Sequence, residues 1–249
     1  MSGHSKWSTI KRKKGAADAK KGAAFTKLIK EITVAARMGG GDPGANFRLR
    51  RAIDEAKLAN MPADNVTRAI KKGTGELEGV SYEELLYEGV GPAGTLFLCE
   101  IMTDNRNRTA AELRKVFDKH GGQLGASGSA AWAFDAKGSI SLPASAATEE
   151  TLFEIAVGAG AEDVQSDGET WHITTPVDAL EAVREALSQA KIEIARAELI
   201  KVPKTPKVIS GEDAERGVSL VETLDEHDDV QKVHTDFELS EEALQNLGS

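Results

Sequence analysis

The residues with the clearest capacity for chemistry in this sequence are the cations of its amino-terminal third. Before Gly75 there are 17 Lys and Arg residues against six Asp and Glu residues, a net charge of +11. The whole chain has a formal net charge of −9, so the remainder carries −20. A compact basic segment joined to an acidic body is typical of a protein that binds a polyanion through one end.

Phosphate contacts would account for this segment. A protein that neutralises six to ten phosphates loses about 10³–10⁵ in affinity between 50 and 200 mM salt. Trp7 lies among the charges and either stacks on a base, contributing about 1–3 kcal/mol, or packs on the protein. The predicted nucleic-acid contacts are Lys6, Trp7, Lys11, Arg12, Lys13, Lys14, Lys20, Lys21, Lys27, Lys30, Arg48, Arg50, Arg51, Lys71, Lys72, Arg106 and Arg108.

Arg106 and Arg108 belong to a separate stretch, TDNRNRTAAE. A strand is expected before it and a helix after it, opened by a capping box from Thr109 to Glu112. Two arginines beside the free N–H groups of a helix start would form a seat for a phosphate or carboxylate. The alternative is that they pair with acids such as Glu88 or Glu112.

The sequence contains no arrangement of residues that is typical of a catalytic site. The five histidines show no metal-ligand spacing, one cysteine cannot build a zinc site, and there is no G-x-S-x-G elbow. The glycine-rich segment 120–134 lacks the Gly-Lys-Ser/Thr of a phosphate-binding loop, and the acidic run 222–230 reads as a solvated helix end. We therefore predict no catalytic residue, metal, cofactor or small-molecule substrate, and a protein that is not an enzyme.

Composition indicates a globular protein. The chain is 40% hydrophobic and 29% charged, and no apolar run approaches the ~20 residues that span a bilayer. The basic amino terminus has no apolar segment behind it, which argues against a secretory signal. Cys99 stands alone, so a reducing cytoplasm is the expected location and no membrane partner is expected.

Residues 1–79 read as a small helical bundle. Apolar residues between Phe25 and Ala36 follow helical spacing, a second helix follows Asn46, and a third begins near Asp64. Residues 5–22 are too polar and rich in glycine and alanine to fold alone, so we expect them to be mobile without a partner.

Strand-like runs begin after this bundle. Residues 84–90 and 95–102 predict two strands, the capping box predicts a helix, and a further strand is expected at Ala130–Phe134. Residues 201–237 then predict a strand, a helix and a strand.

Between these pieces, residues 138–200 predict a complete β-α-β-β-α-β unit. Its central hairpin has Asp167 and Gly168 at the turn, and its second helix is expected to start with Thr175 as the cap and Pro176 at the first position.

The predicted fold is α+β and multidomain, an N-terminal helical bundle followed by two ferredoxin-like α/β sandwich domains with the third inserted in the second. The expected domains are 1–79, 80–135 together with 201–249, and 136–200.

Several long motifs occur in a fixed order: GHSKW, IKRKKGAADAKKGAAFTKLIKEI, ANMPADNVTRAIKKGTGE, YEGVGPAG, TDNRNRTAAELR, KHGGQLGASGS and LDEHDDVQKVHTDFEL. Over essentially its whole length the sequence resembles the YebC/PmpR family, which includes the mitochondrial translational activator of cytochrome oxidase subunit one. The resemblance implies three domains, the third inserted in the second, and no settled catalytic residues.

The resemblance also implies a role in gene expression. Members are generally described as transcriptional regulators that bind DNA, and others act in translation on the ribosome. The sequence shows no clear recognition helix with a base-reading face, so DNA binding through phosphates is one hypothesis and ribosomal RNA or the ribosome is the other. A metabolite-responsive regulator or enzyme is the third and least favoured hypothesis.

Overall fold

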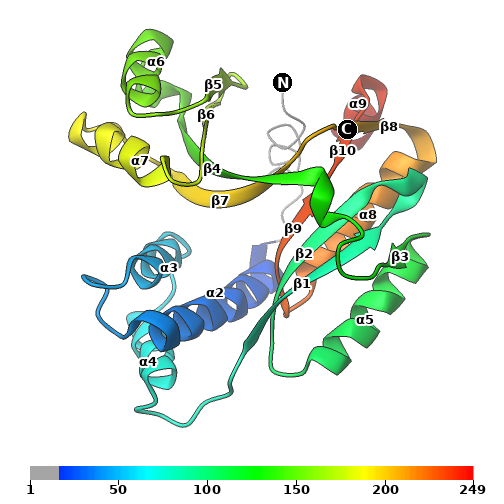
Figure 1. Ribbon diagram of the computed structural model, residues 1–249, viewed down its shortest axis with the longest axis horizontal. Coiled ribbons are helices and arrows are strands. Elements are labelled where there is room, and N and C mark those ends of the chain that lie inside the picture. Colours follow the sequence, from blue (N-terminus) through cyan, green and yellow to red (C-terminus); the bar gives the residue numbers. More distant parts are fainter. Residues whose placement is uncertain (1–16, 249) are drawn as a thin grey trace. The chain divides into compact units, whose positions relative to one another are not determined.

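The computed structural model describes residues 17–248, with side-chain surroundings for residues 22–246 (Figure 1). The described residues form two compact units. The first holds the described residues up to Ala130 together with Gly211–Val233. The second holds Ala131–Ser210 together with the residues from His234 onward.

Three helices open the first unit, as the sequence predicted: α2 (Ala17–Gly39), α3 (Phe47–Leu58) and α4 (Ala63–Thr74). The side chain of Asn46 caps the N-terminus of α3, because its oxygen accepts from the Leu49 N–H at 3.0 Å. The amide nitrogen of the same side chain donates to the Ala35 and Gly40 carbonyls at 2.8 Å. The shared core contains Ile32, Leu49, Ala52, Ala56, Met61 and Ala69. Residues 17–22, which composition assigned to a mobile arm, are the first turns of α2.

A four-stranded sheet in the order β3-β1-β2-β9 follows the helices. Its strands are β1 (Glu83–Val90), β2 (Leu96–Thr103), β3 (Gln123–Leu124) and β9 (Val230–Thr235), with a short 3₁₀ turn at Pro92–Gly94 between β1 and β2. Two helices that pack on each other belong to it, α5 (Arg106–Lys119) and α8 (Gly211–Glu226). Phe117 of α5 lies edge-on to Phe97 of β2, with ring centroids 5.7 Å apart, in the core of this domain.

The second unit contains another four-stranded sheet, in the order β5-β6-β4-β7. In chain order its elements are β4 (Phe134–Pro143), α6 (Glu149–Gly158), β5 (Asp163–Ser166), β6 (Thr170–Thr175), α7 (Leu180–Gln189) and β7 (Arg196–Pro203), with 3₁₀ turns at Ala131–Ala133 and Ala144–Ala146. The predicted hairpin is confirmed, with the Asp167 N–H bonded to the Thr170 carbonyl at 3.1 Å and Gly168 at φ +95°. Strands β8 (Lys207–Ile209) and β10 (Phe237–Leu239) form a parallel pair, and α9 (Glu241–Gly248) follows.

The two sheets have equivalent strand orders. Strands β3, β1, β2 and β9 take the places of β5, β6, β4 and β7, with α5 between β2 and β3 and α8 just before β9. The difference lies in the connection, because β1 precedes its partner β2 whereas β6 follows β4. The fold is therefore the predicted one, N-terminal helices followed by two ferredoxin-like α/β domains with one inserted in the other.

Two predicted helix starts are wrong. Helix α5 begins at Arg106, because Asn105 is the cap and its side chain accepts from the Arg108 N–H at 3.1 Å. Helix α7 begins only at Leu180, since the Thr175 hydroxyl donates to the Pro176 carbonyl at 2.8 Å and does not cap a helix.

The strand expected at Ala130–Phe134 is also wrong. Residues 131–133 form a 3₁₀ turn, and the strand β4 starts at Phe134. Trp132 is 67% exposed, and the run of small residues around it has no buried alternation that would hold a strand in a sheet.

Candidate nucleic-acid interface

Part of the predicted basic surface lies outside the described residues. This applies to Lys6, Trp7, Lys11, Arg12, Lys13 and Lys14. Lys20 and Lys21 are in α2, but their side chains are not among those described. The structure therefore bears on the cations from Lys27 onward.

Two lysines of α2 point into the protein. Lys30 is 6% exposed, and its Nζ lies 2.5 Å from Asp229 Oδ1 while also donating to the carbonyls of Asp228 (2.9 Å) and Met102 (3.2 Å). Lys27 Nζ is 3.8 Å from an Asp225 carboxylate oxygen and donates to the Asp225 carbonyl. Periodicity placed both lysines on the polar side of α2, but α8 and the turn after it cover that side. Lys30 is thus a correction to the predicted contact surface.

Two arginines of α3 are held by acids. Arg48 donates from Nε to Glu31 at 2.8 Å and from Nη2 to Glu84 at 2.6 Å, and its hydrogen bond to Glu31 raises the pKa of Arg48. Arg51 Nε is 3.7 Å from Glu55. Such pairs reduce the charge that these residues can offer to a phosphate.

Arg108 is similarly engaged at the start of α5. Its Nη2 lies 2.8 Å from Asp229 Oδ2 and 2.9 Å from Asp104, so the alternative of pairing with acids holds for this residue. Arg106 is exposed and has no ion pair within residues 22–246, and its carbonyl accepts from the Tyr87 hydroxyl at 3.1 Å. An anion-binding site that uses both arginines would require Arg108 to break its ion pairs with two carboxylates.

The cations that remain available in the helical segment gather on α4. Arg68, Lys71 and Lys72 are exposed, and none forms an ion pair in the part of the chain that the structure describes. Arg50 on α3 is also exposed, with its guanidinium 5.5 Å from the Phe47 ring and no carboxylate partner among the described residues. Arg68 was not among the predicted contacts. Its signal in the sequence was its helical spacing from Lys71 and Lys72, three and four residues on.

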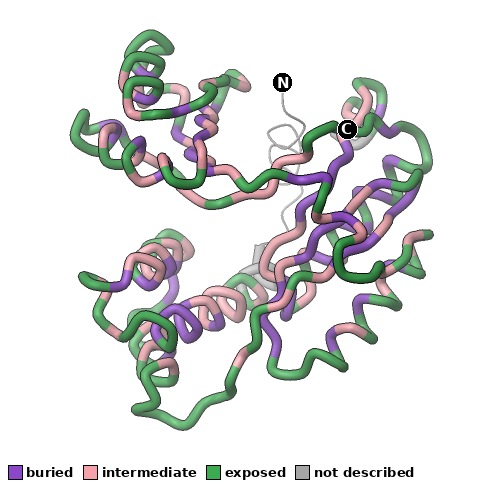
Figure 2. The backbone as a smooth tube through the Cα atoms, in the orientation of Figure 1, coloured by how far each residue is buried: buried purple, intermediate pink, exposed green. Residues whose placement is uncertain are grey.

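The exposure of α4 follows from how it packs. Ala69 is its one buried residue, and Figure 2 draws most of the helix as exposed or intermediate. At Gly73 an added Cβ would lie 2.4 Å from the Thr33 carbonyl and 2.7 Å from the Ala36 Cβ. The helix therefore approaches α2 closely at Gly73, with Ala69 buried and Val66 and Ile70 packed against the shared core, and its remaining side is exposed.

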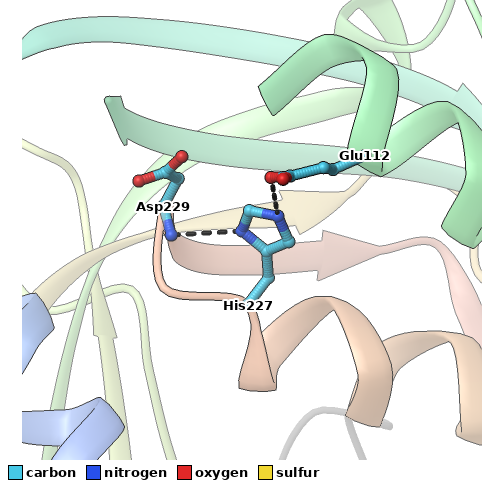
Figure 3. A group of neighbouring side chains, drawn as sticks. All are labelled: Glu112, His227 and Asp229. Atoms are coloured by element: carbon cyan, nitrogen blue, oxygen red, sulfur yellow. Dashed lines mark hydrogen bonds and ion pairs between the residues drawn. The ribbon is translucent and has the colours of Figure 1, made fainter. Parts of the chain in front are cut away.

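A cluster that sequence spacing could not show joins Glu112, His227 and Asp229, drawn in Figure 3. The His227 Nδ1 accepts from the Asp229 backbone N–H at 3.1 Å, which leaves Nε2 to face Glu112 Oε2 at 3.1 Å. Asp229 Oδ2 already accepts from the Thr103 and Thr109 hydroxyls and from Arg108 (3.2, 2.7 and 2.8 Å). The Asp229 Oδ2 lone pairs thus already accept hydrogen bonds from the protein. The cluster is therefore better explained as a structural contact between α5 and the α8–β9 turn than as a metal site.

No helix among residues 17–248 combines the length and the apolar composition that crossing a membrane requires.

The fold and the surface define a multidomain α+β protein: a helical segment with exposed basic residues on α4, followed by two ferredoxin-like domains. Residues 5–76 match the family model for the TACO1/YebC protein N-terminal domain, and residues 82–237 match the model for the TACO1/YebC second and third domain. This chain belongs to the TACO1/YebC family.

Relatives in that family share its full length. A "Probable transcriptional regulatory protein" of Desulfatibacillum aliphaticivorans is 57% identical over 98% of this chain and 99% of its own. One of the same name from Chlorobium luteolum is 52% identical over 99% of each chain. The crystal structure of a conserved hypothetical protein, Aq1575 from Aquifex aeolicus, is 48% identical and matches with a TM-score of 0.84 over 92% of this chain and 94% of that one.

Proposed function

We propose that this protein is a non-enzymatic regulator of gene expression in the cytoplasm that binds nucleic acid, in the first place duplex DNA, through its basic helical segment. The observation that carries the proposal is the exposed cations of α4, which form no ion pair within residues 22–246. The names of the relatives, probable transcriptional regulatory proteins, support a role in transcription.

The charge distribution explains how such binding would be oriented. Cations that are not already neutralised by carboxylates can release counterions from a phosphate backbone, and each contact adds about 0.9 to the slope of log affinity against log salt. The acidic domains repel the same backbone. Binding would therefore be confined to the helical segment and would weaken steeply with salt.

The test compares two adjacent cation pairs on different helices. Lys71→Gln with Lys72→Gln removes two exposed charges from α4. Arg114→Gln with Lys115→Gln removes two charges from α5 that are also exposed and form no ion pair among the described residues. Fluorescence anisotropy with a random-sequence duplex, at several salt concentrations, gives the affinity and the salt slope for each variant.

We expect the α4 variant to lower the salt slope by about 2 and to weaken binding, and the α5 control to leave both unchanged. Equal effects of the two variants would contradict the assignment to α4. Co-sedimentation with ribosomes, combined with no preference for duplex DNA, would assign the protein to translation.

A further inference from the structure

Helix α6 exposes apolar side chains that its own domain does not cover. Leu152 and Ala156 of this helix are buried in the core shared with α7 and the sheet β5-β6-β4-β7. Next to each of them in the sequence, Phe153 is 57% exposed and Val157 is 39% exposed. A surface helix that already buries an apolar stripe normally carries polar residues on its other side. Phe153 and Val157, four residues apart and so neighbours on the helix surface, are therefore not explained by packing within the domain.

Three carboxylates flank this apolar pair. Glu149, Glu150 and Glu154 are exposed, and none of them forms an ion pair within residues 22–246. Together with Phe153 they line a shallow hollow of about 550 Å³. The helix dipole favours Glu149 and Glu150 in the first turn of α6, but Glu154 lies beyond that turn and gains nothing from it. We call these three glutamates with Phe153 and Val157 the α6 face.

The cations of the same domain are engaged elsewhere. Residues 134–203 contain 13 acidic and five basic residues, a net charge of −8. Three of the five bases form ion pairs at 2.7–2.9 Å with glutamates outside α6, and these pairs are Lys137–Glu162, Arg184–Glu181 and Arg196–Glu198. The α6 face therefore keeps its negative charge, which repels nucleic acid and anionic lipid and attracts a cationic partner.

An exposed aromatic side chain with charged neighbours has the composition of a protein–protein interface, in which aromatic residues occupy the buried centre and charged residues the rim. We propose that the α6 face binds a lysine- and arginine-rich segment of another protein. An apolar side chain of that segment covers Phe153 and Val157, and its cations pair with the three glutamates. This inference does not depend on nucleic-acid binding, because α6 lies outside the basic helical segment.

The experiment uses the full chain and a short fluorescent peptide of lysine and leucine residues that forms an amphipathic helix. A second peptide has its leucines replaced by glutamine. Phe153→Ser removes the aromatic side chain, and Glu149→Gln with Glu150→Gln removes two adjacent carboxylates from the first turn of α6. The matched control is Glu241→Gln with Glu242→Gln, which removes two adjacent exposed carboxylates from the first turn of α9, a helix without an aromatic residue.

Fluorescence anisotropy at two salt concentrations gives the affinities. We expect the parent to bind the lysine–leucine peptide more tightly than its glutamine analogue, and Phe153→Ser to weaken that binding at least about tenfold. The α6 double variant should bind more weakly at low salt and show a smaller salt dependence, whereas the α9 control should behave like the parent. Equal affinity for the two peptides, unchanged binding by Phe153→Ser, or equal effects of the two double variants would each overturn the proposal.

A second copy of this chain is the competing occupant, because its basic helical segment is also cationic. Sedimentation velocity without peptide decides between them: we expect the parent and Phe153→Ser to sediment alike. Self-association of the parent that Phe153→Ser abolishes would assign the α6 face to a second copy and overturn the proposal. If Phe153→Ser alters the circular dichroism spectrum, the α6 double variant still tests the face.

Failure here is distinguishable from failure of the proposed function. The variants of α6 keep the cations of α4, so they should bind duplex DNA like the parent whatever they do to the peptide.

Discussion

The ammonium of Lys30 lies 2.5 Å from the carboxylate of Asp229, and both side chains are more than nine-tenths buried. The two residues are 199 positions apart, so this contact joins α2 to the turn before β9. Asp229 also accepts from Thr103, Thr109 and Arg108. One carboxylate therefore connects α2, β2, α5 and the α8–β9 turn.

Breaking this pair should destabilise the protein strongly. Lys30→Met leaves a buried carboxylate without its closest cation, and we expect a loss of about 3–5 kcal/mol in the free energy of unfolding. Urea denaturation followed by circular dichroism measures it. Lys57→Met serves as the control, because Lys57 is exposed and its pair with Asp54 at 3.1 Å is expected to contribute less than about 1 kcal/mol. A loss in Lys30→Met no larger than in the control would refute the buried-pair interpretation.

Stability should also fall in acid because of Asp229. Burial by itself would raise the pKa of this carboxyl, but hydrogen bonds from Lys30, Thr109 and Arg108 outweigh burial and hold the pKa well below its ordinary value. The folded state thus binds the proton more weakly than the unfolded state. The contribution is complete above the unfolded pKa of about 3.9 and is lost as the pH falls toward the folded value.

Asp229→Asn should remove this contribution. We expect the free energy of unfolding of the parent to decrease more steeply than that of the variant between about pH 4 and pH 2, with the variant less stable at neutral pH. Denaturation curves at several pH values give the comparison. Parallel curves for the two proteins in acid would show that Asp229 is not the group responsible.

The close approach of α4 to α2 should tolerate no side chain at Gly73. Gly73→Ala would place a Cβ 2.4 Å from the Thr33 carbonyl, so the helices must move apart at a cost of about 1–3 kcal/mol. Gly22→Ala is the matched control within a helix, since an added Cβ there meets nothing within 4 Å and alanine favours the helix by about 0.5–1 kcal/mol. Thermal unfolding of both variants should therefore shift in opposite directions. A stabilised Gly73→Ala would show that the contact with α2 is looser than described.

The local stability of the glycine-rich loop after β3 should depend on Glu88. This carboxylate is 4% exposed and accepts the N–H groups of Gly128 and Ala130, both at 2.6 Å. Glu88→Gln replaces one accepting oxygen with a donor, so one of these N–H groups loses its partner. We expect hydrogen exchange at Gly128 or Ala130, whichever loses its acceptor, to accelerate at least about tenfold, which corresponds to about 1.4 kcal/mol of local stability, while amides of α6 stay unchanged. Unchanged protection at both loop amides would exclude this role for Glu88.

Much of the fold was readable in the sequence because its signals are local. The helix after Asn46, the hairpin at Gly168 and the β-α-β-β-α-β order of residues 138–200 follow from caps, turns and periodicity within a few residues. The misplaced start of α5 has a distant origin: Asn105 and Thr109 are both good caps, but the Thr109 hydroxyl is engaged by Asp229, 120 residues away, and Asn105 is the cap. The division into domains at 79, 135 and 200 stays a prediction.

The sequence by itself determined that the basic charge lies in the amino-terminal third and that the chain continues with two acidic α/β domains. The tertiary structure decided which cations are available, because Lys30 and Arg48 find carboxylates 199 and 36 residues away while Arg68, Lys71 and Lys72 find none among the described residues. Charge is a property of composition, whereas its neutralisation depends on distances that only the folded chain sets.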